Sequence, residues 1–286
     1  MKSSLSFNNY PNLKIGFSTQ NFQKIMKVNV VNLAELLEYA SYEGYQFIMI
    51  RDDLAELSDS ECVVLSEYAR KFNIEIIYEI HKNPLDEGYM KLFEKGLRNA
   101  TLFGAPGIIR TIVSKSEFDN DPLKKGWTGS EFVQLTKVCD DCAAKAEKVD
   151  IKFVVENFNE AFFSDGHDFF GLADLLTNTL GTGLQFDISN PFRNTSRAKA
   201  EPERVEQYLK NLGKRWITTH LKTILDGEIQ PVLTDNPIPI ERVVNLMGIH
   251  NVTWVALELP GDEDKSQCYK SHAMSIKYLK DKGILK

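Results

Sequence analysis

The segment YQFIMIRDDLAELSDSECVVLSEYARKFNIEIIYEIH, residues 45–81, contains the structural unit that repeats along this chain. It begins and ends with runs of β-branched and aromatic residues, Tyr45–Arg51 and Ile74–His81, which predict two strands. Between them, Ser58 and Glu61 form a capping box, in which each residue satisfies an unpaired backbone donor, and a helix is expected over Ser58–Phe72. The strand runs are nearly continuous apolar stretches, which is typical of parallel strands covered on both faces.

The same alternation of short apolar runs and longer amphipathic segments extends over the whole chain. The strand-like runs are Leu13–Ser18, Tyr45–Arg51, Ile74–His81, Gly107–Val113, Ile151–Glu156, Gly183–Asp187, Trp216–Lys222 and Val252–Glu258. The helix-like segments are Asn32–Tyr42, Ser58–Phe72, Gly88–Phe103, Ser130–Val149, Asp168–Asn178, Glu201–Leu212, Pro239–Met247 and Ser266–Lys280. Strict alternation of strands and helices requires a parallel sheet with right-handed crossovers.

Such a sheet is either open and doubly wound or closed as a barrel, and two features favour the barrel. A (β/α)8 barrel typically needs about 250 residues, and the 286 residues of this chain accommodate eight units. A doubly wound sheet usually has a Gly-rich turn after its first strand, whereas STQNF follows here at residues 18–22. The sequence therefore predicts an α/β fold, a (β/α)8 TIM barrel in a single domain over residues 1–286, with residues 1–12 as an N-terminal extension.

Composition and charge limit the classes of partner. The chain has 34 Lys and Arg against 40 Asp and Glu, and a net charge of −6 argues against nucleic acid as the main partner. No apolar stretch approaches the about 18 residues that span a bilayer. Residues 1–12 are polar and lack the apolar core of a secretory signal. These features predict a cytoplasmic protein that binds neither nucleic acid nor membrane.

The four cysteines are too few and too scattered for a disulfide framework. Cys139 and Cys142 form a C-x-x-C pair, but they lie inside a helix-like run and lack the second cysteine pair of a zinc motif. They are therefore expected to be ordinary buried thiols.

Residues capable of chemistry stand at the ends of the last four predicted strands. Glu156 and Asp187 end two successive runs, His220 lies near the end of the next, and Glu258 ends the last. In a (β/α)8 barrel the active site lies at the C-terminal ends of the strands, so these side chains are expected to meet at one rim. A single charged residue at a strand end is usually a solvated terminus. Four in phase on consecutive strands indicate a shared site.

Three carboxylates that converge on one point repel each other and need a counter-charge. A divalent cation supplies it, and a set of two Glu, one Asp and one His suits Mn²⁺, Mg²⁺, Co²⁺ or Zn²⁺. The sequence therefore predicts one divalent metal ion. Its expected ligands are Glu156, Asp187, His220 and Glu258.

The strings around these residues resemble the metal-ligand motifs of the xylose isomerase-like TIM barrels. They are VVENF at Glu156, LQFDISN at Asp187, ITTHLK at His220 and VALELPG at Glu258. That superfamily includes sugar and sugar-phosphate isomerases and epimerases, inosose dehydratase and DNA-repair enzymes of the endonuclease IV type. The spacing of the predicted strands extends the resemblance over nearly the whole chain. The specific part of the resemblance is the set of four expected ligands between residues 156 and 258.

This resemblance implies a metal-dependent sugar or sugar-phosphate isomerase or epimerase. In the family the metal holds adjacent oxygens of an open-chain sugar and stabilises an enediolate. Glu156 and Glu258 would face opposite sides of the substrate carbon, so that one removes a proton and the other returns one. Two alternatives stay open: a metal-dependent lyase that dehydrates a keto-inositol or a sugar acid, and a barrel that binds a carbohydrate without turnover.

Two candidates for substrate binding lie close to the expected ligands in sequence. Lys222 points to the same side of its strand as His220, where it either neutralises a substrate phosphate, carboxylate or oxyanion or is solvated. Asn190 stands where many family members have a histidine. An asparagine can hydrogen-bond a sugar hydroxyl but is a poor metal ligand. This departure and the small number of histidines speak against the three-zinc endonuclease branch.

Three further residues complete the predicted substrate site. Asn157 follows Glu156 in the Glu-Asn dipeptide of the sugar-acting branch. His81 at a strand end is either a substrate contact or a structural residue paired with Glu79, and Arg193 either recruits an anionic substrate or is solvated in its loop. The expected ligand is a small sugar or sugar phosphate. Barrels of this family often associate, so a homo-oligomer is also expected.

Overall fold

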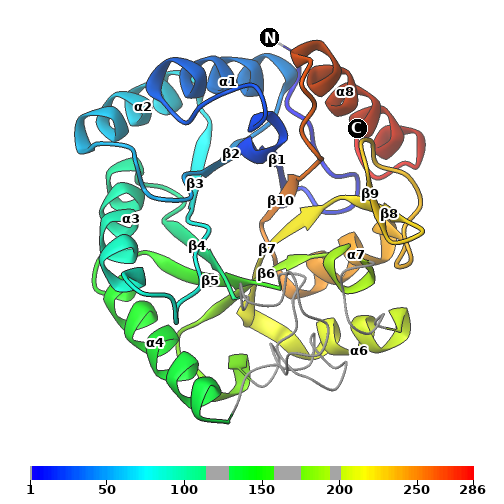
Figure 1. Ribbon diagram of the computed structural model, residues 1–286. Helices are drawn as coiled ribbons and strands as arrows, with labels where there is room; N and C mark the ends of the chain where they lie inside the picture. Colours follow the sequence, from blue (N-terminus) through cyan, green and yellow to red (C-terminus); the bar gives the residue numbers. More distant parts are fainter. Residues whose placement is uncertain (1, 114–128, 158–174, 194–200) are drawn as a thin grey trace.

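The computed structural model describes residues 2–113, 129–157, 175–193 and 201–286 of the 286-residue chain. Eight parallel strands close into a barrel in the order β1-β10-β7-β6-β5-β4-β3-β2, as Figure 1 shows along the barrel axis. The strands are β1 (Lys14–Ser18), β2 (Phe47–Arg51), β3 (Glu75–Glu79), β4 (Ile108–Ile112), β5 (Lys152–Glu156), β6 (Gly183–Asp187), β7 (Trp216–Leu221) and β10 (Trp254–Leu257). The predicted (β/α)8 barrel is confirmed.

The helices form a ring outside the strands (Figure 1). They are α1 (Val30–Glu43), α2 (Asp59–Phe72), α3 (Tyr89–Phe103), α4 (Gly129–Glu147), α6 (Pro202–Leu212), α7 (Ile240–His250) and α8 (Lys265–Asp281). Residues 175–178 are helical, and the rest of the helix expected over Asp168–Asn178 lies outside the described residues. The predicted capping box of α2 is present, because Ser58 Oγ accepts from the Glu61 N–H and Glu61 Oε2 accepts from the Ser58 N–H. Over the described ranges, the helices are too short or too polar to cross a membrane.

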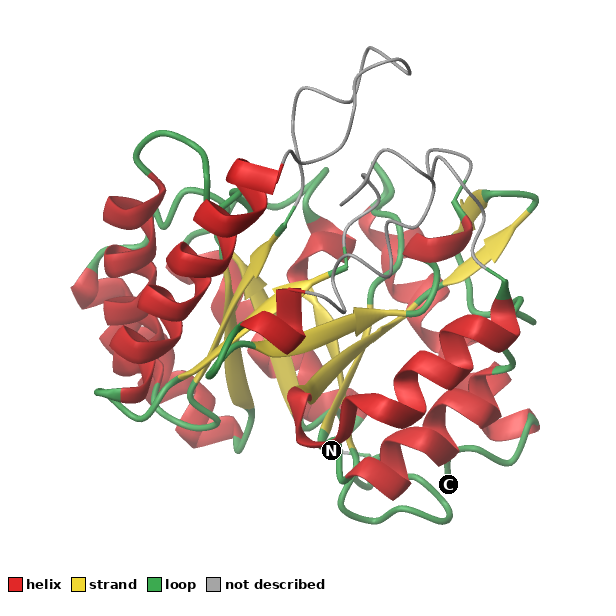
Figure 2. Cartoon of the chain, turned by 90° about the horizontal axis from the view of Figure 1, so that it is seen from below, coloured by secondary structure: helices red, strands yellow, loops and turns green. Residues whose placement is uncertain are grey.

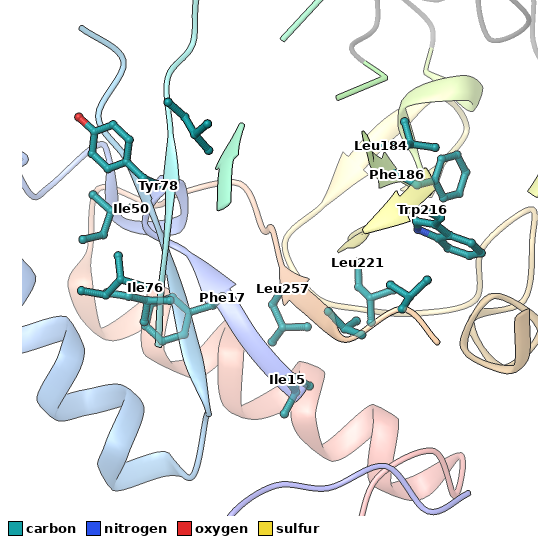
Figure 3. Packing of buried hydrophobic residues seen from close by; sticks show 14 of the residues in the cluster. Ile15, Phe17, Ile50, Ile76, Tyr78, Leu184, Phe186, Trp216, Leu221 and Leu257 are labelled. Atoms are coloured by element: carbon teal, nitrogen blue, oxygen red, sulfur yellow. The ribbon is translucent and has the colours of Figure 1, made fainter. Parts of the chain in front are cut away.

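Two apolar layers fix the barrel. Outward-facing strand residues such as Ile15, Phe17, Ile76 and Trp216 pack beneath the helices, as Figure 3 shows, and belong to one large buried cluster. A second, smaller cluster lies inside the barrel and consists of Phe47, Met49, Ile77, Ile108, Val154 and Ala256. Since side chains alternate between the two faces of a strand, the two clusters occupy alternate positions along β2, β3, β4, β5 and β10.

Gly16 on β1 shows how tightly the barrel interior is packed. A Cβ at this position would lie 2.3 Å from the Phe47 main-chain oxygen and 2.7 Å from its ring. Any side chain there would displace β2, because protein interiors have few voids that could absorb it. Glycine therefore lets β1 and β2 approach closely at the base of the barrel.

Toward the C-terminal ends of the strands, the inward-facing residues change from apolar to charged over a step of two residues. Glu79, Arg110, Glu156 and Glu258 each stand two residues after a member of the inner apolar cluster. All four charged side chains are buried. The apolar inner cluster is thus the floor of a polar, water-poor layer at the C-terminal ends of the strands.

The strict alternation of strand and helix is interrupted after β7. Thr223–Leu225 (β8) and Glu228–Gln230 (β9) pair antiparallel as a hairpin, with Asp226 and Gly227 at positive φ in the turn. The sequence prediction placed no strands here. The strand ends also differ slightly from the prediction, because Lys222, Glu258 and His81 lie just beyond β7, β10 and β3.

Both chain termini lie at the same end of the barrel (Figure 2). Leu5 and Phe7 are buried, and Phe7 forms an isolated bridge with Leu285 after α8. The segment expected as an N-terminal extension therefore packs against the base of the barrel.

Cys139 and Cys142 are buried on α4 and form no disulfide. Burial raises the pKa of the Cys142 thiol to about 12 and that of Cys139 well above its ordinary value. Thiols that stay protonated in this way are poor nucleophiles and poor metal ligands. The prediction of ordinary buried thiols is confirmed.

Candidate metal centre

Four side chains converge above the floor of the barrel from four neighbouring strands. β5, β6, β7 and β10 stand side by side in the closed sheet. Each contributes one buried residue within one position of its C-terminal end. These residues are Glu156, Asp187, His220 and Glu258, and one ligand atom of each lies within 4.8 Å of the others. The structure thus brings together the four residues that the sequence predicted as ligands.

The imidazole of His220 stands between the carboxylates. Its Nδ1 lies 3.3 Å from Glu156 Oε1, 3.3 Å from Glu258 Oε2 and 3.9 Å from Asp187 Oδ2. This nitrogen is buried and makes no hydrogen bond within the described part of the chain. Burial lowers the pKa of His220, but Glu258 and Glu156 outweigh burial and raise it well above its ordinary value. A buried nitrogen without a hydrogen bond, surrounded by carboxylates, fits a position next to a cation.

Asp187 is held rigidly by the backbone that follows it. Its Oδ1 accepts hydrogen bonds from the N–H groups of Ser189 (2.8 Å) and Asn190 (3.0 Å). The Asn157 side chain holds the Asp187 backbone from both sides, because Oδ1 accepts from the Asp187 N–H (2.6 Å) and Nδ2 donates to its C=O (2.9 Å). These bonds leave Oδ2 directed toward the cluster, 2.5 Å from Lys222 Nζ.

Charge counting at this site leaves a deficit of positive charge. Besides the three carboxylates of the cluster, Glu79 lies beneath His220. In the described ranges, Arg110 and Lys222 are the only lysine or arginine residues that pair with these four acids. Two fixed cations against four carboxylates leave two negative charges, and the raised pKa of His220 means that a proton on this ring meets one of them in the ion-free cluster. A divalent cation that replaced this proton would balance both charges, so the donor set and its charge fit such an ion.

Comparisons with protein-family models and with curated proteins find no match. Solved structures do match. A D-psicose 3-epimerase solved in the presence of D-fructose superposes with a TM-score of 0.71 at 13% identity, covering 94% of this chain and 98% of that one. A xylose isomerase-like TIM barrel protein from Mycobacterium smegmatis in complex with magnesium gives 0.66 at 16% identity, covering 98% and 99%. A 3-keto-D-glucoside 4-epimerase from E. coli gives 0.68 at 13% identity, covering 93% and 99%.

This chain shares the TIM-barrel fold of these structures. Because function resides in sites placed on a fold rather than in the fold itself, the chemistry of this barrel must be argued from its own side chains.

Lys222 reaches the cluster itself. Its Nζ contacts both Asp187 Oδ2 and Glu258 Oε2, and its side chain is only 5% exposed. Of the two alternatives for this residue, a solvated lysine is therefore wrong. Burial lowers the pKa of Lys222, but Asp187 and Glu258 outweigh burial and raise it, so the ammonium stays charged.

The other predicted substrate contacts occupy different settings. Asn157 and Asn190 form a chain, since Asn190 Nδ2 donates to the Asn157 C=O at 2.9 Å. His81 is partly buried beyond β3, where burial and Arg51 lower its pKa to about 4. Arg193 is partly buried and ends the short helix Asn190–Phe192. Their predicted contacts with substrate stay predictions.

Sequence reasoning did not connect Glu79 or Arg110 with the expected ligands. Glu79 was paired with His81, whereas in the structure it bonds to Arg110 (Nε to Oε1, 3.0 Å). The available signal was a charged residue inside an apolar strand run, as in GIIRTIV around Arg110. A buried charge is rare unless paired, so that pattern indicates an inward-facing partner on a neighbouring strand.

Proposed function

We propose that this protein is a divalent-metal-dependent sugar isomerase or epimerase. The main support is the charge imbalance of the buried cluster, in which four carboxylates face two fixed cations. The structural similarity to a D-psicose 3-epimerase and a 3-keto-D-glucoside 4-epimerase adds to it. The proposed ligands are Glu156, Asp187, His220 and Glu258. Mn²⁺, Mg²⁺, Co²⁺ and Zn²⁺ are the candidate ions.

Glu156 and Glu258 are the proposed acid and base. They come from β5 and β10, the two outer strands of the group of four, so they flank a substrate that sits over Asp187 and His220. One carboxylate takes the proton from the carbon next to the carbonyl, and the other returns a proton. A bound divalent ion would supply electrophilic stabilisation of the negative charge that develops on the substrate oxygens.

The residues around this pair have distinct proposed roles. Lys222 places a positive charge beside Glu258 and Asp187, where it also faces a substrate oxyanion or phosphate. Asn157 positions Asp187 through its two backbone hydrogen bonds, while Asn190, His81 and Arg193 are the proposed contacts for substrate hydroxyl or anionic groups.

The test is isotope exchange together with metal analysis. Purified protein is analysed for bound metals, reloaded with each candidate ion and incubated in D2O with a panel of ketoses, ketose phosphates and inososes. Glu156→Gln and Glu258→Gln should each lower deuterium incorporation by at least about 100-fold, the lower range for a general acid or base. Glu94→Gln serves as the control, because Glu94 is an exposed acid on α3 in a surface ion pair.

Each outcome separates the candidate functions. Exchange with inversion at one carbon supports an epimerase, and exchange with carbonyl migration supports an isomerase. Loss of water from the substrate would replace the proposal with a dehydratase. Sugar binding without exchange, in protein shown to contain its metal, would replace it with a binding barrel.

A further inference from the structure

A fully buried ion pair lies directly below the candidate metal centre. Glu79 at the end of β3 and Arg110 in the middle of β4 are cross-strand neighbours in register. Both side chains are at most 1% exposed, and Arg110 Nε donates to Glu79 Oε1 at 3.0 Å. Neither residue belongs to the proposed ligand set or to the proposed acid and base.

Glu79 stands behind His220 on the side away from the cluster. Its Oε1 lies 3.5 Å from His220 Nε2, while His220 Nδ1 faces the three carboxylates. Gln185 fixes the position of that oxygen, because its Nε2 donates to Glu79 Oε1 at 3.0 Å and its Oε1 accepts from Thr218 Oγ1 at 2.8 Å. The same Gln185 Nε2 also donates toward His220 Nε2 at 3.1 Å, and the weakly accepting Met49 sulfur lies 3.1 Å from that ring nitrogen. Among the described residues, Glu79 is therefore the carboxylate beside Nε2.

A bound cation would change the form of the imidazole, because without it Nε2 faces the Gln185 amide donor. A histidine that binds a cation through Nδ1 must hold its remaining proton on Nε2, and the group that accepts this proton fixes both the tautomer and the ring orientation. Glu79 is the carboxylate in the right place to do so.

Arg110 contacts Glu156, another member of the proposed ligand set, from outside the cluster. Its Nε lies 3.4 Å from Glu156 Oε2, and the other oxygen, Oε1, faces His220 Nδ1. The guanidinium therefore holds one oxygen of the carboxylate at the barrel wall and leaves the other directed toward the cluster. One ion pair on β3 and β4 thus supports a residue of the neighbouring strand β5 and a residue of β7 on the opposite side of the barrel.

Packing alone does not account for this pair. The inward residues one repeat below, Ile77 and Ile108, are apolar and fully pack the interior. Replacing a buried ion pair with apolar residues of similar volume is often neutral or stabilising. Charged residues at the next level therefore indicate a role that apolar residues cannot fill.

We propose that Glu79 and Arg110 are positioning residues of the metal centre: Glu79 holds His220 with its proton on Nε2, and Arg110 restrains Glu156 so that one oxygen faces the ion. The inference rests on the proposed function, because it assumes that a divalent cation binds to the cluster.

Cobalt binding provides the test. Metal-free protein is titrated with Co²⁺, and the affinity and the visible absorption, which reports ligand geometry, are recorded. Glu79→Gln should weaken binding by about 10- to 100-fold, the usual effect of losing an outer partner of a metal ligand, and alter the spectrum. Glu75→Gln is the matched control: Glu75 lies two strand repeats below on the same face of β3 and also pairs with a cation, Lys14 Nζ at 2.5 Å.

A double variant separates positioning from stability. Glu79→Gln combined with Arg110→Met removes both charges of the pair. Glu156 then loses its contact with Arg110 but keeps the one with His220, so the double variant is expected to fold even where the single variant does not. Binding that stays weak in the double variant supports positioning. Binding that returns to the wild-type level shows that the single variant lost affinity through the unpaired guanidinium, and this overturns the inference.

The remaining outcomes are equally decisive. Wild-type protein that binds no Co²⁺ overturns the proposed function itself. Wild-type binding together with equal affinities for Glu79→Gln and Glu75→Gln overturns only the positioning role. In wild-type protein loaded with Zn²⁺, ¹⁵N NMR should find His220 bound through Nδ1 and protonated at Nε2, with its signals identified by their loss in His220→Gln. Binding through Nε2 overturns the inference without any variant at Glu79.

Discussion

The buried His272 on α8 makes the stability of this barrel depend on pH in a predictable direction. Asn21 Nδ2 donates to His272 Nε2 at 2.9 Å and to the Leu257 C=O at 3.1 Å. The Asn21 Oδ1 accepts from the Leu259 N–H at 2.8 Å. Because Nε2 is an acceptor in this network, the proton of the neutral ring lies on Nδ1 and points to the Tyr45 hydroxyl, 3.2 Å away.

Protonation of His272 would direct a second N–H at the Asn21 amide and place a charge in a dry aromatic cluster. Burial accordingly lowers the pKa of His272 to about 3, against about 6.5 in an unfolded chain. The folded pKa lies below the unfolded one, so the unfolded state takes up a proton first as the pH falls. The stabilisation is complete above pH 6.5 and is lost progressively as the pH decreases toward 3. In this window the difference in proton uptake lowers the free energy of unfolding by about 1.4 kcal/mol per pH unit. Because the window opens near pH 6.5, the loss between pH 7 and pH 5 is about 2 kcal/mol.

The assay compares urea unfolding of wild-type protein and His272→Gln at both pH values. Other groups, including His81, change with pH in both proteins and cancel in the difference between them. Wild-type protein should lose about 2 kcal/mol more stability than the variant on going from pH 7 to pH 5. His250→Gln, at the partly exposed end of α7, controls for removal of one imidazole. Equal losses in wild type and His272→Gln would refute the reasoning.

Two further predictions concern the cluster. Lys222→Met removes the ammonium between two buried carboxylates, so the metal-free protein should lose about 3 kcal/mol of stability. In urea unfolding with and without Mn²⁺, the ion should stabilise the variant more than it stabilises wild type. Equal stabilisation would contradict the idea that Lys222 and the ion neutralise the same carboxylates. Asn157→Ala removes both side-chain bonds to the Asp187 backbone and should cost about 1–3 kcal/mol of stability and weaken metal binding. An unchanged unfolding free energy with a raised KM would instead assign Asn157 to substrate.

The fold was predictable because each local signal agreed with the others. The apolar runs, the amphipathic segments between them and the capping box at Ser58 all indicated the same alternation, and consistency between levels is what makes a sequence specify one structure. The hairpin after β7 was missed for a physical reason. Each of its strands has three residues, and Leu225 in it is exposed, so it lacks the buried alternation by which strands are recognised.

The convergence of the site was predictable because strand ends lie at one rim of a barrel, but the contacts within it were not. Which inward residue of β3 meets which residue of β7 depends on the stagger of the closed sheet, and no local pattern encodes that stagger. The sequence therefore predicted that Glu79 pairs with His81, which is two positions further along the chain. In the structure its partners are Arg110, Gln185 and His220, from three other strands.

The charged layer lies directly on the apolar residues inside the barrel, and this burial affects which charges the site can carry. Glu79, Glu156 and Glu258 follow apolar inward residues by one strand repeat, so the layers share walls and no solvated gap separates them. In such surroundings an uncompensated charge costs far more than at a surface. Burial opposes the ionisation of Glu79 and Glu156, yet Arg110 and His220 together outweigh it and bring the pKa of Glu79 to about 2 and that of Glu156 below its ordinary value. Glu79 and Glu156 therefore stay ionised, whereas burial raises the pKa of Asp187. A cation bound among these side chains would favour the charged form of each carboxylate.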